Sequence, residues 1–408
     1  MVKLGDLNGV MANNYGLVSL QRDYWDSPWQ NRQAMMSAFA RTTAPVLFVG
    51  PAFELGELVD GTAFRRTRSR GTQDVAPRLH AHTPPRYLPM SGRLPILDRA
   101  TRRARRAIVE REIARLGITR PVAYVWHPAA VNGLDLFDAA AIVYHKYDHY
   151  QGYAGGTSTP DPAEQALIAR ADAVLVTSQG LLDMHVQERP DIELVPNGVD
   201  YEAFAAAAAH RVLPDDLARV PGPRVGYVGV VNEKVDFALL EALATRRPEW
   251  SIVLVGPDRV RDPQARASFD RLKGRANFHH LGDKAARDVP PYVAGLDVCL
   301  MSYLINGWTF YGYPLKMHEY LAAGRPSVAT DLPAIREFKH VVTIAHDVDQ
   351  WEDAIAAGLR ADDAEAIAAR QSVARQNSWD ERTRAADVII RRCLARKNDG
   401  HASRPSPV

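Results

Sequence analysis

Cysteine is scarce in this chain of 408 residues, which contains only Cys299 and Cys393. Two cysteines so placed form neither a disulfide framework nor a metal-site spacing, and their scarcity favours a reducing compartment. No apolar run approaches the roughly 20 residues that a transmembrane helix needs. The first residues also lack the apolar core of a signal peptide. We therefore expect a cytoplasmic protein.

The chain also lacks a large excess of charge of either sign. Its 50 Lys and Arg residues balance 48 Asp and Glu residues, for a net charge of +2. Residues 65–115 depart from this balance, with fourteen arginines against four acids. A basic helical surface can dock on the anionic headgroups of a membrane, and the alternative is an ordinary solvated helix face. Because no aromatic platform accompanies the charge, we expect no nucleic-acid partner.

The chain contains two series of alternating strands and helices. Hydrophobic residues make up 46% of it and charged residues 24%, the values of a globular protein with full cores. The alternation in both halves predicts an α/β fold of two Rossmann-like domains that face each other across a cleft. We place the first domain at residues 1–205 and the second at 206–377. The polar residues 397–408 are expected to form a disordered tail.

The most informative stretch is WTFYGYPLKMHEYLAAGRPSVATD, residues 308–331. Pro314 suits the first turn of a short helix, predicted at residues 315–323, and Gly324 suits its C-cap. A loop that leads into a helix N-terminus exposes unpaired N–H groups, which favour an anion. Lys316 and Glu319 share a face there, so that a lysine can meet a phosphate and a carboxylate can accept hydrogen bonds from sugar hydroxyls. The alternative is an exposed Lys–Glu pair on an ordinary helix.

A second phosphate-binding candidate opens the second domain, in GYVGVVNEKVDF at residues 226–237. Gly229 would permit a close backbone approach, and Lys234 would supply charge near the start of a helix. This motif is weak by itself, and it is not a Walker A loop because the glycine-lysine-threonine order is missing.

Two polar loops of the first domain follow predicted strands, where open α/β sheets bind ligands. Asp23 and Trp25 lie in QRDYWDSPWQNRQ, as acceptor-side candidates or as surface packing. Asp148 and His149 lie in HKYDHYQGYAGG, where an acid and a histidine can exchange or orient a proton. A zinc site is the poorer alternative because soft ligands are missing, and a polar loop with satisfied hydrogen bonds is another.

Residues 314–333, PLKMHEYLAAGRPSVATDLP, resemble the donor-site segment of GT-B glycosyltransferases of family 4, the group 1 family. The similarity is greatest to bacterial members that build surface polysaccharides and teichuronic-type polymers. Many members carry two glutamates separated by seven residues, and here Glu319 stands at the second position while Tyr311 replaces the first. Tyrosine can form a hydrogen bond but cannot carry the negative charge. In such proteins a final helix, here expected at 378–396, returns to the N-terminal domain.

The resemblance implies a role for each candidate residue. The C-terminal domain would bind the donor, and Asp148 and His149 would be catalytic or orienting residues opposite it. Asp23 and Trp25 would lie on the acceptor side. The residues implied in donor binding are Gly229, Lys234, Tyr311, Tyr313, Pro314, Lys316 and Glu319.

The resulting expectation is a hexosyltransferase that moves a sugar from a nucleotide diphosphate sugar to a glycan, lipid-linked or small-molecule acceptor. It would need no metal and no cofactor beyond this co-substrate, because lysines can stabilise the leaving diphosphate. Peripheral contact with the inner face of an anionic membrane would suit a lipid-linked acceptor. Two alternatives stay open, a nucleotide-sugar epimerase and a non-catalytic GT-B scaffold. Both stereochemical outcomes also stay open, because the family implies retention whereas Tyr311 and Asp148 would suit inversion.

Overall fold

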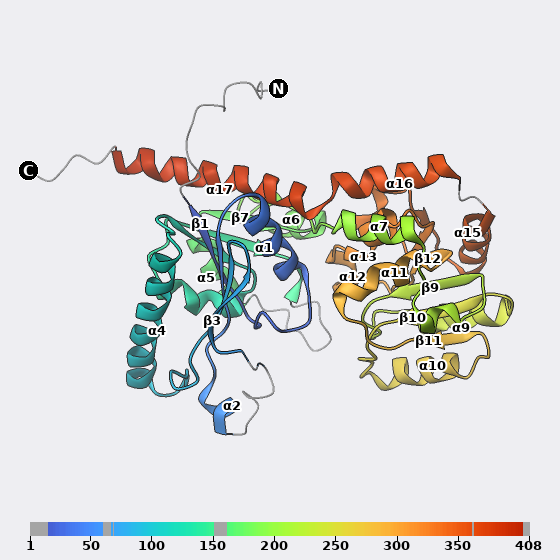
Figure 1. Cartoon of the computed structure of the whole chain (residues 1–408), viewed down its shortest axis with the longest axis horizontal. Helices are drawn as coiled ribbons and strands as arrows, with labels where there is room; N and C mark the ends of the chain where they lie inside the picture. Colours follow the sequence, from blue (N-terminus) through green and yellow to red (C-terminus); the bar gives the residue numbers. More distant parts are fainter. Residues whose placement is uncertain (1–14, 60–66, 68, 151–160, 361–362, 403–408) are drawn as a thin grey trace, which may run out of the picture.

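The computed structural model describes residues 15–59, 67, 69–150, 161–360 and 363–402. Its strands form two sheets, one in each half of the chain (Figure 1). The first sheet has the order β3-β4-β2-β1-β5-β6-β7-β8 and is parallel except for β3. The second has the order β11-β10-β9-β12-β13-β14, with parallel pairs. This arrangement confirms the predicted fold class of two parallel-sheet α/β domains.

The elements of the first half alternate along the chain as the sequence pattern indicates. Its described strands are β1 (Gly16–Leu20), β2 (Val46–Val49), β3 (Gly71–Ala76), β4 (Leu79–Thr83), β5 (Pro121–Val125), β6 (Ala141–Lys146), β7 (Ala173–Val176) and β8 (Glu193–Leu194). Its described helices are α1 (Asn31–Thr42), α2 (Leu55–Val59), α4 (Pro95–Arg115), the 3₁₀ helix η1 (Pro128–Leu136), α5 (Pro162–Arg170) and α6 (Gln179–His185).

The second half repeats this alternation. Its described strands are β9 (Arg224–Val228), β10 (Ser251–Val255), β11 (Phe278–His280), β12 (Val298–Met301), β13 (Ser327–Ala329) and β14 (Thr343–Ile344). Its described helices are α7 (Tyr201–His210), α8 (Asp215–Ala218), α9 (Phe237–Arg246), α10 (Pro263–Lys273), the 3₁₀ helix η3 (Ala286–Asp288), α11 (Val289–Ala294), α12 (Gly307–Tyr311), α13 (Leu315–Ala322), α14 (Pro333–Arg336), α15 (Val348–Arg360) and α16 (Ala364–Gln376), and α17 (Trp379–Ala402) ends the described chain.

Local sequence signals explain where several helices begin. Three helices begin with an aspartate whose side chain accepts a hydrogen bond from a backbone N–H of the first turn. These aspartates are Asp200 at α7, Asp236 at α9 and Asp262 at α10. Such a cap satisfies one of the N–H groups that a helix start leaves unpaired. The central strands are buried on both faces; every residue of β10 is buried. Continuous apolar runs such as SIVLV are typical of parallel strands covered by helices on both sides.

The hairpin β3–β4 is a feature that the sequence pattern did not predict. Strand β4 pairs in parallel with β2, with Val46 opposite Leu79. Its sequence LHAHT is nearly all buried, although two of its five residues are histidines. Polar residues within a buried strand hide the apolar run by which such strands are recognised. Here tertiary pairing placed a polar segment inside the sheet.

The last helix, α17, joins the two halves of the molecule (Figure 1). It begins at Trp379, where Gly198 lies so close that a Cβ would overlap the Trp379 backbone. Farther along, Ile389 and Ile390 are buried in the core of the first domain. Full burial of each side chain stabilises this docking by about 1.5–3 kcal/mol.

The expectation of a disordered tail from residue 397 was wrong for its first six residues. Helix α17 continues to Ala402. Lys397 forms an ion pair of 2.7 Å with Asp172, and Asn398 accepts a hydrogen bond of 3.1 Å from Arg120. These contacts with the first domain stabilise helical turns whose polar composition indicated disorder. Residues 403–408 lie outside the described residues.

Candidate functional site

Three glycine turns lie together at the carboxyl edge of the second sheet, after β9, β10 and β11. The Gly229 N–H donates to the Val255 carbonyl at 2.7 Å, and the Gly256 N–H donates to the Gly282 carbonyl at 2.8 Å. Gly229 and Gly256 have φ angles of 145° and 141°. A Cβ at Gly256 would overlap the backbone of Gly229. Without side chains at these turns, a ligand can approach the backbone closely.

Lys316 lies over the first of these turns. Its Nζ atom is 5.3 Å from the centroid of the Tyr227 ring. A Cβ at Gly229 would overlap the Lys316 side chain, so the glycine makes room for the lysine. The cation–π contact and the adjacent N-terminal turn of α13 fix a positive charge beside exposed backbone. This is the environment that the sequence predicted for an anion.

Lys234 brings a second ammonium group to the same place. Its Nζ atom lies 5.3 Å from the ring centroid of Tyr303 and 5.5 Å from that of Trp308. Burial, followed by repulsion from Lys316, lowers the pKa of Lys234 to about 7, and Asp148 of the first domain acts in the opposite direction. A lysine whose charged form is disfavoured in this way gains stability from a bound anion.

Glu319 lies one helical turn after Lys316 on the same face of α13. Burial raises the pKa of its carboxyl group, and the positive charge of Lys316 opposes this shift. Among the residues that the structure describes, the Glu319 carboxyl group has no hydrogen-bond partner. It is therefore available to accept hydrogen bonds from ligand hydroxyl groups.

Tyr311 contacts the first domain. Its ring packs against that of His149, with centroids 4.9 Å apart. Its carbonyl oxygen accepts a hydrogen bond of 2.6 Å from Ser178 Oγ. The residue that stands at the first glutamate position of the motif thus forms part of the contact between the domains.

Tyr313 and Pro314 support the α13 segment from behind. The Tyr313 side chain is buried, and its hydroxyl group forms a hydrogen bond of 2.7 Å with His318 Nε2. Its carbonyl oxygen accepts a hydrogen bond of 3.2 Å from Asn197 of the first domain. Pro314 occupies the N-cap position of α13, one residue before the first turn in which the sequence placed it. A direct role of the Tyr313 ring in ligand binding stays a prediction.

On the first domain, Asp23 forms the outer member of a buried chain of contacts. Its carboxylate accepts a hydrogen bond of 2.6 Å from Arg32, whose side chain is 2% exposed. Arg32 also donates to the Tyr147 hydroxyl group at 3.0 Å and lies over the Tyr147 ring. This chain links the loop after β1 to the loop after β6, which carries Asp148. The carboxyl ends of these parallel strands lie at one edge of the sheet.

Trp25 packs against the core of its own domain. Its ring meets Phe48 and Trp29 edge-to-face, at centroid distances of 5.0 and 5.7 Å. These contacts favour the packing alternative for Trp25. Its role on the acceptor side stays a prediction.

Asp148 and His149 lie where the first domain approaches the lysines. Asp148 accepts a hydrogen bond of 2.9 Å from the backbone N–H of His149. The pKa of His149 is lowered, first by burial and then by the charge of Lys146. Its Nδ1 atom is buried and has no hydrogen-bond partner in the described part of the chain. A neutral imidazole with a free nitrogen can accept a proton.

A buried ionic cluster behind this loop escaped the sequence analysis. Lys146 forms an ion pair of 2.8 Å with Glu164, and both side chains are at most 5% exposed. Lys146 Nζ also lies 2.9 Å from His185 Nε2, and the Tyr144 hydroxyl group donates to Glu164 at 2.7 Å. No short motif joins these residues, because α5 and α6 bring two of them to β6 from distant positions.

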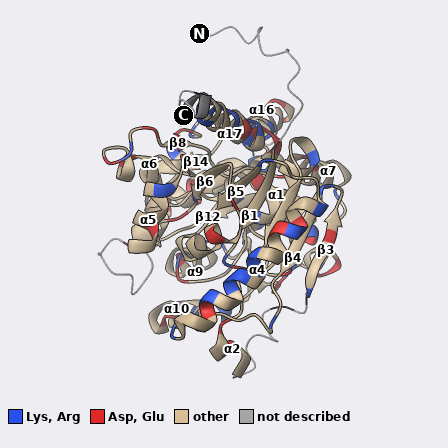
Figure 2. Cartoon of the chain, turned by 90° about the vertical axis from the view of Figure 1, so that its left-hand side faces the viewer, with Lys and Arg blue, Asp and Glu red and all other residues tan. Residues whose placement is uncertain are grey.

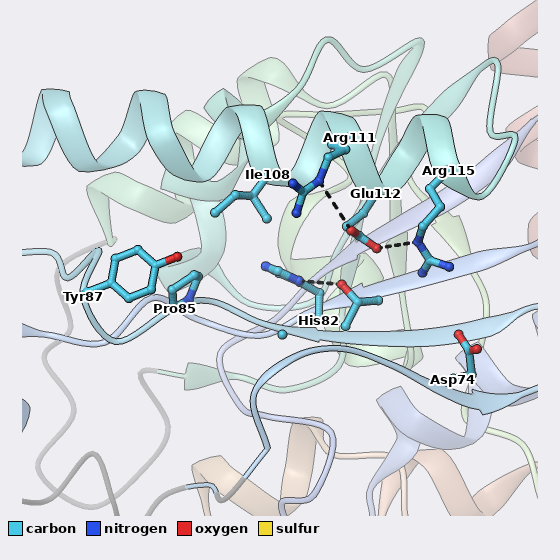
Figure 3. Close-up of a pocket in the computed structure, with 10 residues that line it drawn as sticks. Asp74, His82, Pro85, Tyr87, Ile108, Arg111, Glu112 and Arg115 are labelled. Atoms are coloured by element: carbon cyan, nitrogen blue, oxygen red, sulfur yellow. Dashed lines mark hydrogen bonds and ion pairs between the residues drawn. The ribbon is translucent and has the colours of Figure 1, made fainter.

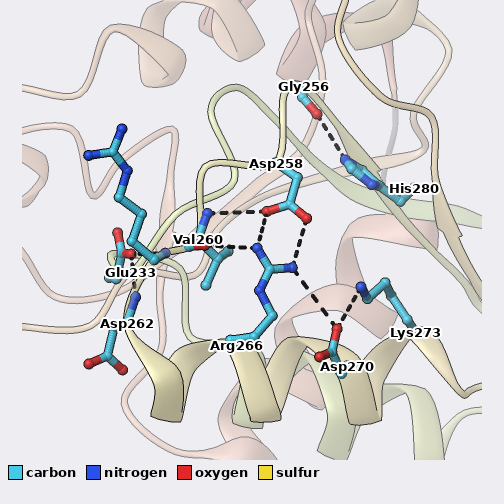
Figure 4. A network of polar contacts seen from close by, with 10 residues as sticks. Glu233, Gly256, Asp258, Val260, Asp262, Arg266, Asp270, Lys273 and His280 are labelled. Atoms are coloured by element: carbon cyan, nitrogen blue, oxygen red, sulfur yellow. Dashed lines mark hydrogen bonds and ion pairs between the residues drawn. The ribbon is translucent and has the colours of Figure 1, made fainter.

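A polar network encloses the outer side of the glycine turns (Figure 4). Glu233 accepts hydrogen bonds from the backbone N–H groups of Arg261 and Asp262. Asp258 receives two hydrogen bonds from Arg266, of 2.7 and 2.8 Å, which lower the pKa of its carboxyl group. These contacts connect the loops after β9 and β10 and the start of α10, and so stabilise the turns.

Two further hollows lie away from the lysines. One, of about 400 Å³, is bounded by the hairpin β3–β4 and by α4, with His82 and Glu112 buried in its wall (Figure 3). The other, of about 510 Å³, adjoins Asp331 and Arg336. In the described residues no group of three or more His, Cys, Asp or Glu side chains could hold a metal ion. No helix of the described chain is long and apolar enough to cross a membrane.

Comparisons with known proteins agree with this geometry. Residues 222–361, which carry the glycine turns and both lysines, match the family model "Glycosyl transferases group 1". A Bacillus subtilis (strain 168) protein with the provisional name teichuronic acid biosynthesis glycosyltransferase TuaH is 33% identical over 178 residues. That match covers 42% of this chain and 43% of the relative, so the chain spans less than half of the relative's length.

Solved structures extend the likeness to both domains. Sucrose-phosphate synthase from Thermosynechococcus elongatus has a TM-score of 0.65 at 16% identity, covering 93% of this chain and 99% of its own. Anabaena HepE, solved in complex with UDP and glucose, has a TM-score of 0.62 at 14% identity, covering 92% and 99%. At such identities the likeness shows the fold alone, which is the GT-B fold. Residues 222–361 are therefore similar to the group 1 glycosyltransferases, and the whole chain has the GT-B fold.

Proposed function

We propose that the protein transfers a sugar from a nucleotide diphosphate sugar to a hydroxyl group of an acceptor. The observation that carries this proposal is the convergence of Lys316 and Lys234 on the backbone of Gly229. Two ammonium groups beside exposed backbone match the charge of a diphosphate. They would stabilise the negative charge that develops on the diphosphate as it leaves the sugar.

Glu319 would then bind the sugar or ribose. Its carboxyl group lies on the same helix face as Lys316 and has no hydrogen-bond partner in the described chain. The turns at Gly256 and Gly282 would lie along the nucleotide base. The backbone contact between the turns would hold these groups in place before the ligand arrives, which lowers the cost of binding. We propose that no metal ion is needed, because the lysines can supply the positive charge.

The acceptor would bind against the first domain. Asp148 and His149 would act as catalytic or orienting residues there, and the chain of Asp23, Arg32 and Tyr147 would support their loop. Because the pKa of His149 is lowered, its imidazole is neutral at neutral pH and can receive the proton of an acceptor hydroxyl group. The acceptor class that we propose is a glycan or a lipid-linked sugar, in keeping with the name of the TuaH relative.

A thermal-shift panel of UDP-, GDP-, dTDP- and ADP-sugars tests donor binding. UDP-glucose is the first compound to try, since neighbours were solved with UDP and glucose and with UDP-2-fluoro glucose. We expect one nucleotide to raise the melting temperature of the wild type and not of Lys316→Ala. The exposed Lys339→Ala, in the same domain, is the matched control and should respond as the wild type does.

The outcomes of this panel separate the alternatives. Loss of the shift in both variants would mean that general charge, not the Lys316 site, binds the nucleotide. No shift with any nucleotide would favour a non-catalytic scaffold. A nucleotide-sugar epimerase would pass the binding test but would convert the donor without any acceptor, which product analysis detects.

A further inference from the structure

The loops after β2 and β4 meet at one end of the first domain. The Leu55 N–H at the start of α2 donates to the Met90 carbonyl at 2.8 Å, and the Met90 N–H donates to the Phe53 carbonyl at 2.7 Å. Met90 precedes α4 by a few residues, so α2 and the start of α4 share this end. Figure 1 places α2 there, below the sheet of the first domain.

Large apolar side chains are unusually exposed at this end. Ile96 is 85% exposed, Val59 84% and Tyr87 78%, the three highest values for large hydrophobic residues in the described chain. Leu94 is 53% exposed and Leu55 38%. Single exposed apolar residues are normal on a protein surface, but a group of them indicates a binding surface.

Several arginines accompany the apolar residues at the start of α4. On α4, Arg99 comes three residues after Ile96, and Arg103 comes four residues after Arg99. At these spacings the three residues lie on one face of the helix. Figure 2 shows several Lys and Arg positions along α4. In the described chain the side chains of Arg93, Arg99 and Arg103 have no acidic partner, whereas Arg102 pairs with an acid. Two unpaired arginines four residues apart repel each other, and an anionic partner would offset this cost.

The same end of the domain is continuous with the acceptor-side loop. Thr67 donates a hydrogen bond of 2.7 Å to Asp26, three residues after Asp23, and Arg86 donates to the Thr67 carbonyl at 2.9 Å. Strands β1, β2 and β4 are parallel, so the loops after them emerge at one edge of the sheet. A surface that docked at this end would hold the loop after β1 close to its partner.

We propose that this end of the first domain docks on an anionic lipid bilayer. The apolar side chains would enter the boundary between headgroups and acyl chains, and the arginines would contact headgroup phosphates. The link to catalysis rests on the proposed function, because docking would bring a lipid-linked acceptor to the loop after β1. We call this region the α2–α4 surface, made of Leu55, Val59, Tyr87, Arg93, Leu94, Ile96, Arg99 and Arg103.

The apolar component favours a bilayer over a soluble polyanion. Arginines alone would suit a nucleic acid or an acidic protein. A polyanion, however, offers no apolar environment to Ile96, Val59 and Leu94, whose exposure to water is unfavourable. A bilayer matches both components of the surface.

Flotation of the full chain with vesicles tests this proposal. Vesicles of phosphatidylcholine alone are compared with vesicles that also contain phosphatidylglycerol. We expect binding to the anionic vesicles and weak binding to the neutral ones. The double variant Arg99→Gln/Arg103→Gln should bind anionic vesicles roughly 30-fold more weakly, given the contribution of each basic residue near a membrane. Tyr87→Ser/Ile96→Ser should bind about tenfold more weakly or worse.

The matched control is Val212→Ser/Arg219→Gln, which changes an exposed apolar residue and an exposed arginine of the second half. It should bind as the wild type does, and all variants should keep the thermal shift with nucleotide. Equal loss in the control, no vesicle binding by the wild type, or binding to heparin but not to vesicles would each overturn the proposal. Because nucleotide binding is measured separately, failure of the membrane surface and failure of the proposed function give different results.

Discussion

The proposed donor side and the proposed acceptor side of the candidate site are built in different ways. On the donor side, Gly229, Lys234 and Lys316 are held by backbone turns and aromatic rings of a single domain. On the acceptor side, Asp23 and Asp148 depend on a buried arginine and on side-chain contacts between separate loops. Where the backbone holds the site, substitutions that change its shape should have the larger effect on binding. Where pairs of side chains hold the site, substitutions that remove a charge should have the larger effect. Four predictions test this difference.

The largest effect is expected for Gly229→Val, which should abolish measurable binding of the nucleotide sugar. The new Cβ would overlap Lys316, and the φ of 145° is unfavourable for a side chain. Calorimetry measures the loss. The control is Gly117→Ala, because Gly117 has a φ of 67° and open space around it, so that the substitution introduces backbone strain alone. It should lower the free energy of unfolding by about 1–2 kcal/mol and leave nucleotide binding intact. Equal loss of binding in both variants would refute the role of shape.

Asp148→Asn should reduce turnover by about 10²–10⁴-fold, the usual contribution of a general acid or base. The affinity for the donor should change little, because the residues that we propose for donor binding lie in the second domain. Steady-state kinetics separates kcat from the KM of the donor. Asp183→Asn, on the exposed face of α6, is the matched control and should keep full activity. A higher KM with unchanged kcat would instead place Asp148 on the donor side.

The affinity for a UDP-sugar should fall by up to about tenfold per pH unit above pH 7. The pKa of Lys234 is about 7 in the ligand-free protein, and the bound diphosphate favours its charged form. Below pH 7 the lysine is already charged, and above it binding must take up a proton. Calorimetry in buffers of different ionisation enthalpy measures this uptake. The Lys234→Met variant should bind the UDP-sugar more weakly and without proton uptake. If its binding kept the pH dependence of the wild type, that dependence would belong to another group.

The smallest effect is expected for Asp23→Asn, which should lower the free energy of unfolding by about 1–3 kcal/mol. It leaves the guanidinium of Arg32, 2% exposed, without its carboxylate. Urea denaturation measures the change. As a comparison, Asp380→Asn breaks an ion pair at the surface, in which Asp380 is 36% and Arg41 64% exposed. It should lower the free energy of unfolding by at most about 1 kcal/mol. Equal costs would mean that Arg32 does not depend on Asp23.

The sequence predicted the local structure around Lys316 better than the contacts between the loops of the first domain, for a physical reason. Lys316, Glu319 and the α13 helix lie within one short stretch, where helix spacing fixes which residues share a face. The acceptor side joins residues that are far apart in the sequence, such as Lys146 and Glu164. Hairpin β3–β4 escaped prediction because its histidines concealed a buried strand.

The sequence by itself determined the two α/β domains, the position of the turn at Gly229 and the face shared by Lys316 and Glu319. These follow from local rules of chain conformation and from the burial of continuous apolar runs. Only the tertiary structure decided that Lys234 meets Lys316, that Tyr311 contacts His149 and that Arg32 joins Asp23 to Tyr147. Such contacts depend on how segments far apart in the sequence pack together. A local sequence pattern does not show which distant residues will become neighbours, so it cannot predict the energy of their packing.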